Sequence, residues 1–105
     1  MRKGIKFLSI ICVLSLLTSC LSAYNLRIGK ESFKRQDYRQ AFIRLLPEAD
    51  HGNPEAQYAV GYMYYYGEGV VEDRRKALYW ISLAAKHGQP DAMRAMGVLA
   101  SQDKN

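Results

Sequence analysis

The chain has 105 residues, of which 15 are Lys or Arg and 10 are Asp or Glu, so its formal charge is +5. This length allows one domain and excludes a multidomain enzyme. A hydrophobic share of 49% and a charged share of 24% are typical of a globular chain rather than a disordered one. The positive charge suggests nucleic acid or an anionic membrane as a partner, provided that the whole chain persists in the mature protein.

The first twenty residues follow the order of a bacterial export signal. A basic segment, Met1–Lys6, precedes eleven uncharged and mostly apolar residues, Phe7–Leu17. Such a run is shorter than a membrane-spanning helix, which needs about 20 residues, and is typical of a signal-peptide core. The next motif, LTSC at 17–20, resembles the lipoprotein box, in which the cysteine is acylated and becomes the new N-terminus. We therefore expect a signal peptide at 1–19 and lipidation of Cys20.

The exported chain would then be tethered to a membrane. Each buried methylene of a lipid chain stabilises binding by about 0.8 kcal/mol, so a triacylated cysteine anchors firmly. Leu21 follows the cysteine, and an Asp there usually retains Gram-negative lipoproteins at the inner membrane, so the resemblance favours the outer membrane facing the periplasm. The alternative is an uncleaved anchor, because no charge occurs from Phe7 through Leu26. With Cys12 removed and Cys20 lipidated, the mature domain has no disulfide.

A repeat with an offset of 36 residues covers most of the remaining chain. His51–Ala56 (HGNPEA) aligns with His87–Ala92 (HGQPDA), and ten of the 28 positions are identical between 37–64 and 73–100. A period in the thirties without strand-like alternation predicts stacked pairs of helices. The expected fold is an all-α, antiparallel helix-hairpin solenoid.

Helix ends are indicated by prolines, glycines and a capping residue. Pro54 and Pro90 suit first helical positions, Asp73 suits an N-cap, and Gly88 suits a left-handed C-terminal residue. The Gly67–Gly69 segment is expected to break the chain after a helix that ends at Tyr66. These signals predict five helices after the signal peptide, at about 23–36, 37–51, 54–66, 73–87 and 90–101.

Between Ala56 and Gly97 the residues resemble the Sel-1-like repeat, a relative of the tetratricopeptide repeat. The pattern G-x-M-Y-x-x-G-x-G-V-x-x-D-x-x-K-A-x-x-W-x-x-x-A-A-x-x-G begins at Gly61. The residues expected to be structural parts of this motif are Ala56, Gly61, Tyr64, Gly67, Gly69, Asp73, Ala77, Trp80, Ala84, Ala85, Gly88 and Gly97.

The resemblance also implies how the repeat domain, 20–105, is organised. It consists of a divergent hairpin at 23–52, a full repeat at 53–88 and a half repeat at 89–102. Small motif residues are expected where helices cross closely, with Trp80 filling a gap between them. As a buried aromatic residue, Trp80 is expected to cost about 3–5 kcal/mol when replaced by alanine.

Residues that could do chemistry have simpler structural interpretations. His51 and His87 lie at equivalent ends of successive second helices, about 10 Å apart by the spacing of packed helices, which is too far for one metal. An imidazole at a helix C-terminus favours the terminal carbonyls, so capping is the preferred interpretation. No cofactor or metal site is expected. Glu68, Glu72 and Asp73 form an acidic loop cluster that is more typical of solvated loops than of paired catalytic carboxylates.

The same reasoning makes catalysis improbable. The Gly67–Gly69 segment follows a helix and lacks the features of a phosphate loop. Ser82 and Ser101 have no base and orienting group nearby in sequence. An enzyme or enzyme subunit acting on cell-wall or β-lactam substrates is the alternative. Cysteine-rich relatives of the family suggest it, but this chain lacks their cysteine pairs.

Tyrosines form the candidate binding site. Tyr58, Tyr62 and Tyr65 are spaced i, i+4, i+7 and share one helix face. First helices line the concave side in this family, and the register places Tyr62 in a ladder with Leu26 and Val98, and Tyr58 beside Arg94. The stripe is interpreted either as a partner-binding surface or as rings packed against neighbouring helices.

The last helix leaves a second question about association. Met93, Met96, Val98 and Leu99 form an apolar set that either packs within the chain or docks onto another subunit. We therefore expect a monomer or a weak oligomer formed through this helix.

The charge changes once the signal is removed. Loss of Arg2, Lys3 and Lys6 leaves 12 basic against 10 acidic residues, so +5 becomes +2. Residues 24–46 have six basic and two acidic side chains, whereas 47–105 have six and eight. This distribution argues against nucleic acid as a partner. It is compatible with a role of the first hairpin at a membrane surface. The sequence therefore predicts an envelope adaptor that binds a protein or peptide.

Overall fold

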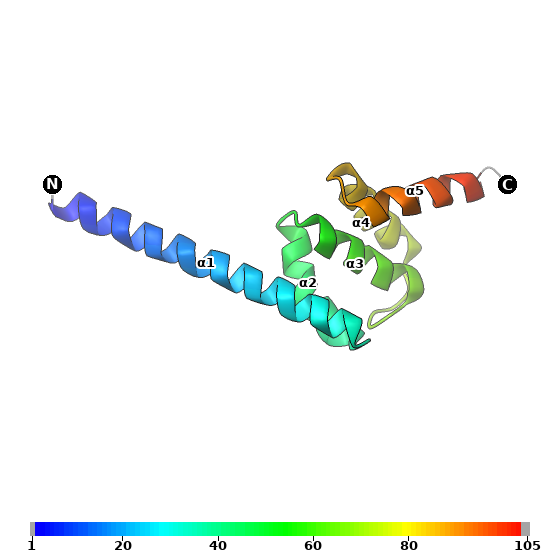
Figure 1. The fold of residues 1–105 in the computed structure, drawn as a ribbon, viewed down its shortest axis with the longest axis horizontal. Coiled ribbons are helices and arrows are strands. Elements are labelled where there is room, and N and C mark those ends of the chain that lie inside the picture. Colours follow the sequence, from blue (N-terminus) through cyan, green and yellow to red (C-terminus); the bar gives the residue numbers. More distant parts are fainter. Residues whose placement is uncertain (1, 104–105) are drawn as a thin grey trace.

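The computed structural model describes residues 2–103 as an all-helical chain (Figure 1). The basic side chains at positions 2 and 3, and residues 104–105, lie outside what it describes. Successive helices pack in order, α1 on α2, α2 on α3, α3 on α4 and α4 on α5. This is the expected all-α hairpin fold. The five helices are α1 (Arg2–Lys34), α2 (Tyr38–Asp50), α3 (Pro54–Tyr66), α4 (Arg74–Lys86) and α5 (Pro90–Asp103).

The first helix is longer than the proline, glycine and capping signals of the sequence predicted. It was expected to begin near Ala23, but α1 begins at Arg2 and runs through the apolar N-terminal segment without interruption. No proline and no glycine occurs between Gly4 and Gly29, so nothing in the chain ends the helix at the expected boundary. The apolar N-terminal segment and the first helix of the domain are therefore one continuous helix.

The other helices begin and end where capping residues allow. The Asn53 carboxamide oxygen accepts a hydrogen bond from the Ala56 backbone N–H at 3.0 Å, and Asp73 caps α4 by accepting from the Lys76 N–H at 3.1 Å. Gly67 ends α3 with φ +69°. Asp73 therefore has the predicted role and α3 ends before Gly67 as predicted, whereas the Asn53 cap was not predicted.

Two small cores hold the hairpins together. Alanines dominate both cores, which allows the helix backbones to approach closely. The first core joins α2 to α3, and the second joins α4 to α5. Their buried members are Ala41, Leu45, Ala49, Ala56, Val60 and Met63 in the first, and Ala77, Ile81, Ala84 and Ala92 in the second.

Two motif residues differ from expectation. Trp80 is only partly buried beside the first core, so the predicted cost of about 3–5 kcal/mol for its loss is too high. Gly61 lies against α4, where an added Cβ would meet Ile81 at 2.6 Å, but its repeat counterpart Gly97 has open space around it. The described chain has no helix after α5 to occupy that space.

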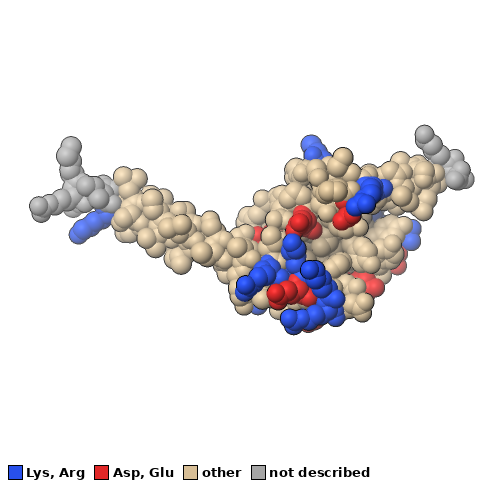
Figure 2. Space-filling model, viewed as in Figure 1, with Lys and Arg blue, Asp and Glu red and all other residues tan. Residues whose placement is uncertain are grey.

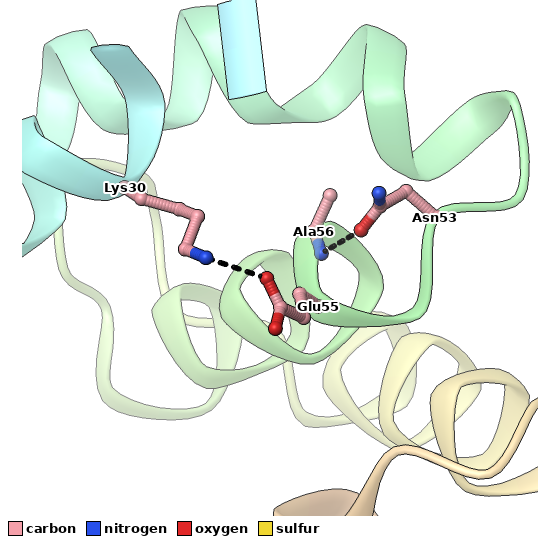
Figure 3. A network of polar contacts seen from close by, with 4 residues as sticks. All are labelled: Lys30, Asn53, Glu55 and Ala56. Carbon is pink, nitrogen blue, oxygen red and sulfur yellow. Dashed lines mark hydrogen bonds and ion pairs between the residues drawn. The ribbon is translucent and has the colours of Figure 1, made fainter. Parts of the chain in front are cut away.

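Contacts from α1 join the first hairpin to the repeat (Figure 3). The Lys30 ammonium lies 2.8 Å from the Glu55 carboxylate at the start of α3. Both side chains are about half exposed, so this ion pair contributes about 0–1 kcal/mol. Deeper in the hairpin, the Ser22 hydroxyl donates to the buried Glu48 carboxylate of α2. Ser22 thus marks the beginning of the packed part of α1.

Candidate functional site

Tyrosines of α3 and aliphatic residues of α5 line an open groove, called the tyrosine groove below. Because α5 packs against α4 and stands away from α3, a space of about 260 Å³ remains between α3 and α5. Ile81 of α4 forms its floor and is 4% exposed. The residues lining the groove are Tyr58, Tyr62, Tyr65, Tyr66, Ile81, Ala95, Val98, Leu99 and Gln102.

Ring contacts hold the tyrosines in place. Tyr62 packs edge-on against Phe33 of α1 with ring centroids 5.4 Å apart, and it lies 4.7 Å from the Tyr66 ring. Tyr65 and Tyr66 are 4.9 Å apart in an edge-on arrangement. Such pairs contribute about 0.5–1.5 kcal/mol each beyond their burial. The groove therefore has an ordered aromatic wall before any partner binds.

The groove is electrically neutral at physiological pH. Burial raises the pKa of the Tyr58 hydroxyl above its ordinary value of 10.0, and the Asp91 carboxylate raises it further, while Arg94 opposes them. Burial also raises the pKa of Tyr62, with Tyr38, Tyr66 and Glu68 adding to the effect. Both phenols therefore stay protonated and remain able to donate and accept hydrogen bonds.

Cations lie at the edges of the groove. The Arg74 guanidinium carbon lies 4.7 Å from the Tyr65 ring centroid, a cation–π distance. Arg94 pairs with Asp91 on the surface of α5 and is not among the lining residues. Polar contacts for a partner are thus available at the rim, while the lining is aromatic and aliphatic.

The structure brings together most of the predicted stripe. Tyr58, Tyr62 and Tyr65 all line the groove, and Val98 lies across from them as the register indicated. The ladder with Leu26 is wrong, because Leu26 packs against the core between α2 and α3 and the α1 neighbour of Tyr62 is Phe33. Tyr66 was missed, although its i, i+4 relation to Tyr62 could have indicated it.

The histidines have separate surroundings at the ends of α2 and α4. His51 and His87 follow these helices as C-cap residues. His87 Nδ1 lies 3.0 Å from the side-chain oxygen of Gln57, a buried residue that sequence reasoning did not single out. Among residues 2–103, no group of three or more His, Cys, Asp or Glu side chains is arranged to hold a metal ion.

The remaining candidates for chemistry have structural contacts. Glu72 pairs with Arg74 at 3.3 Å, and Asp73 caps α4. The Ser82 and Ser101 hydroxyls donate to backbone carbonyls one turn earlier in their own helices. None of these side chains forms a nucleophile–base pair in the described part of the chain.

The N-terminal part of α1 differs sharply from the rest. Residues 6–21 are all exposed, and packing begins at Ser22, two residues after Cys20. In the described chain α1 is the one helix that is long and apolar enough to cross a membrane, by length and composition alone. This apolar helix fits a signal sequence or a membrane anchor. Thr18 and Ser19 lie beside His51 in a shallow recess.

Comparison with known proteins identifies the central repeat. Residues 54–89 match the Sel1 repeat, so the chain contains at least one unit of this family. Sel1 repeats generally mediate protein–protein interactions and are generally non-catalytic. No curated protein and no solved structure matches the chain.

Proposed function

We propose that this protein is a non-catalytic adaptor, tethered in the bacterial envelope, whose tyrosine groove binds an extended segment of a protein partner. The groove itself is the main support for this function. Its length along α3 and α5, its neutral aromatic wall and its open top suit a peptide, because tyrosines offer contact area and hydrogen bonds at low entropic cost. A small-molecule enzyme site would need convergent catalytic groups, which the groove lining lacks in the described residues.

The tether is supported by where packing begins in α1. Every α1 residue that is partly or fully buried lies after Cys20, so removal of 1–19 takes away Thr18 and Ser19 beside His51 but leaves the contacts of Ser22 and the following residues intact. An uncleaved anchor would have 15 uncharged residues, Phe7–Leu21, outside the domain, and 11 of them are apolar. At 1.5 Å per residue these span about 22 Å, short of the ~30 Å hydrocarbon layer. Acylation of Cys20 is therefore favoured, with Leu21 favouring the outer membrane by resemblance.

The function is tested by capturing partners from envelope extracts with a charge placed in the groove. Val98 is 57% exposed and makes none of the ring contacts, so Val98→Asp is expected to block binding while leaving thermal unfolding unchanged. The matched control is Tyr79→Ala, which removes a 60% exposed tyrosine of α4 outside the groove. Loss of the partner with Val98→Asp alone supports the proposal. Equal capture by both variants contradicts it.

A further inference from the structure

The solvent-exposed side of α1 aligns the candidate lipid site with basic residues. Positions three and four residues apart lie on one side of an α-helix. Cys20 therefore shares a face with Tyr24, Arg27, Glu31 and Lys34, and all five are exposed. We call these five residues the outer face of α1.

The opposite side of α1 is occupied by the domain. Gly29 and Ser32 are buried there, Ser22 bonds to Glu48, and Phe33 packs against Tyr62. Since α1 cannot rotate without breaking these contacts, the outer face is fixed relative to the rest of the molecule. A lipid chain on Cys20 would leave the helix on the same side as Arg27 and Lys34.

Charge on this side is mostly positive. Figure 2 shows basic side chains gathered around the C-terminal end of α1, beyond a long uncharged stretch. Glu31 is the one acidic residue of the outer face, and it lies 3.7 Å from Arg35 just past the helix. Arg27 and Lys34 make no ion pair within the described residues. The surface therefore complements negative charge.

We propose that residues 20–35 of α1 lie along an anionic phospholipid surface, with the outer face toward the headgroups. This inference rests on the tether proposed above. If α1 stood upright on Cys20, Lys34 would lie about 21 Å from the lipid, beyond the ~8 Å over which charge acts at physiological salt. When α1 lies flat, Arg27 and Lys34 come within this distance of the anionic headgroups. Tyr24 then lies at the membrane–water interface, where aromatic side chains are favoured.

This orientation has a consequence for the tyrosine groove. Helices α4 and α5 lie on the far side of α3 from α1 (Figure 1). With the outer face on the membrane, the wall formed by α5 is held away from the lipid. The groove is thus presented to a partner in the aqueous phase at a fixed distance from the bilayer.

The test uses the full chain expressed with its own N-terminus, extracted in detergent and returned to vesicles. A fluorophore is attached at Glu31→Cys on the outer face or, as a control, at Ser82→Cys on α4, both with Cys12→Ser. Vesicles of phosphatidylcholine, with or without phosphatidylglycerol, contain a headgroup nitroxide quencher. We expect quenching at position 31 but not at 82 in the anionic vesicles. The quenching at position 31 should disappear at about 1 M NaCl, where the screening length is about 3 Å.

Charge variants separate this inference from the tether itself. Arg27→Gln with Lys34→Gln is expected to abolish quenching at position 31 while the protein stays in the vesicles. The matched control combines Arg75→Gln with Lys86→Gln at exposed positions of α4. This pair should leave the quenching at position 31 unchanged. Absent quenching in anionic vesicles, or quenching that neither salt nor the outer-face variants change, would overturn the proposal. Labelling of Cys20 itself would instead show that the thiol is free and the tether is wrong.

Discussion

The side-chain amide of Gln57 donates a hydrogen bond to the carbonyl oxygen of Ala49 across 3.1 Å, and so joins α3 to the end of α2. Its oxygen lies 3.0 Å from His87 Nδ1 at the end of α4. Gln57 is 1% exposed, so one buried amide connects three helix termini of successive hairpins. We expect this contact to help set the angle between these hairpins, and with it the position of the tyrosine groove.

Replacing Gln57 with methionine keeps most of the side-chain volume and removes both hydrogen bonds. We expect Gln57→Met to lower the free energy of unfolding by about 1–2 kcal/mol. The cost is moderate because Ala49 also accepts from the Gly52 N–H at 3.0 Å. Urea unfolding of the detergent-extracted protein measures the change, with Gln102→Met at an exposed position as the control. Equal midpoints for the two variants would show that Gln57 does not tie the hairpins together.

Gly69 is the glycine for which replacement is most severe. Its φ is +74°, and an added Cβ would lie 2.6 Å from the Tyr38 carbonyl carbon. Gly88 has φ +88° but open space around it. Gly88→Ala should therefore cost about 1–2 kcal/mol for the left-handed backbone alone. Gly69→Ala is expected to cost more, because the backbone of α2 must also move. Melting temperatures of the two variants compare these costs directly, and a smaller drop for Gly69→Ala would contradict the packing described.

The raised pKa values of Tyr58 and Tyr62 predict alkaline destabilisation. A folded-state pKa above the ordinary 10.0 means that the folded chain binds the proton more tightly than the unfolded chain. The stability that these two groups contribute is thus complete below about pH 10 and decreases as the pH rises through their folded-state pKa values. Tyr62→Phe should lose less stability than the native chain between about pH 8 and pH 11. Identical pH profiles for Tyr62→Phe and the native chain would refute the assignment.

The tether predicts a specific N-terminus. Mass spectrometry of the native protein should find an acylated peptide that begins at Cys20, and Cys12→Ala should leave that peptide unchanged. Cys20→Ala should prevent lipid incorporation, because the thiol is the atom that receives the diacylglyceryl group. A native protein that retains Met1 would instead establish the uncleaved anchor.

Local signals fixed some elements and left others open. Pro54, Gly67 and Asp73 specify helix ends through their own backbone and hydrogen-bonding chemistry, so α3 and α4 were predicted closely. The start of α1 was not predicted, because no glycine or proline occurs between Gly4 and Gly29 to signal a helix boundary near Ala23. The end of its exposed part at Ser22 depends on Glu48, which is distant in sequence.

The groove could be predicted only in part for a similar reason. Helical spacing places three tyrosines on one face of α3, but spacing does not say how far α5 stands from that face. The gap arises because α5 packs against α4 through small residues such as Ala92, while Val98 stays exposed. Gln57 was overlooked because a single glutamine has no periodic pattern, and its burial follows from the arrangement of three helices.

The adaptor function is tested most directly by photo-crosslinking from two positions of α5. Val98 and Met93 are 57% and 56% exposed, but only Val98 lines the tyrosine groove. A benzophenone side chain at position 98 should form an adduct with one envelope protein, and Tyr62→Ala should eliminate that adduct. The same probe at position 93 should not form it. An identical adduct from both positions, or one that persists in Tyr62→Ala, would contradict binding in the groove.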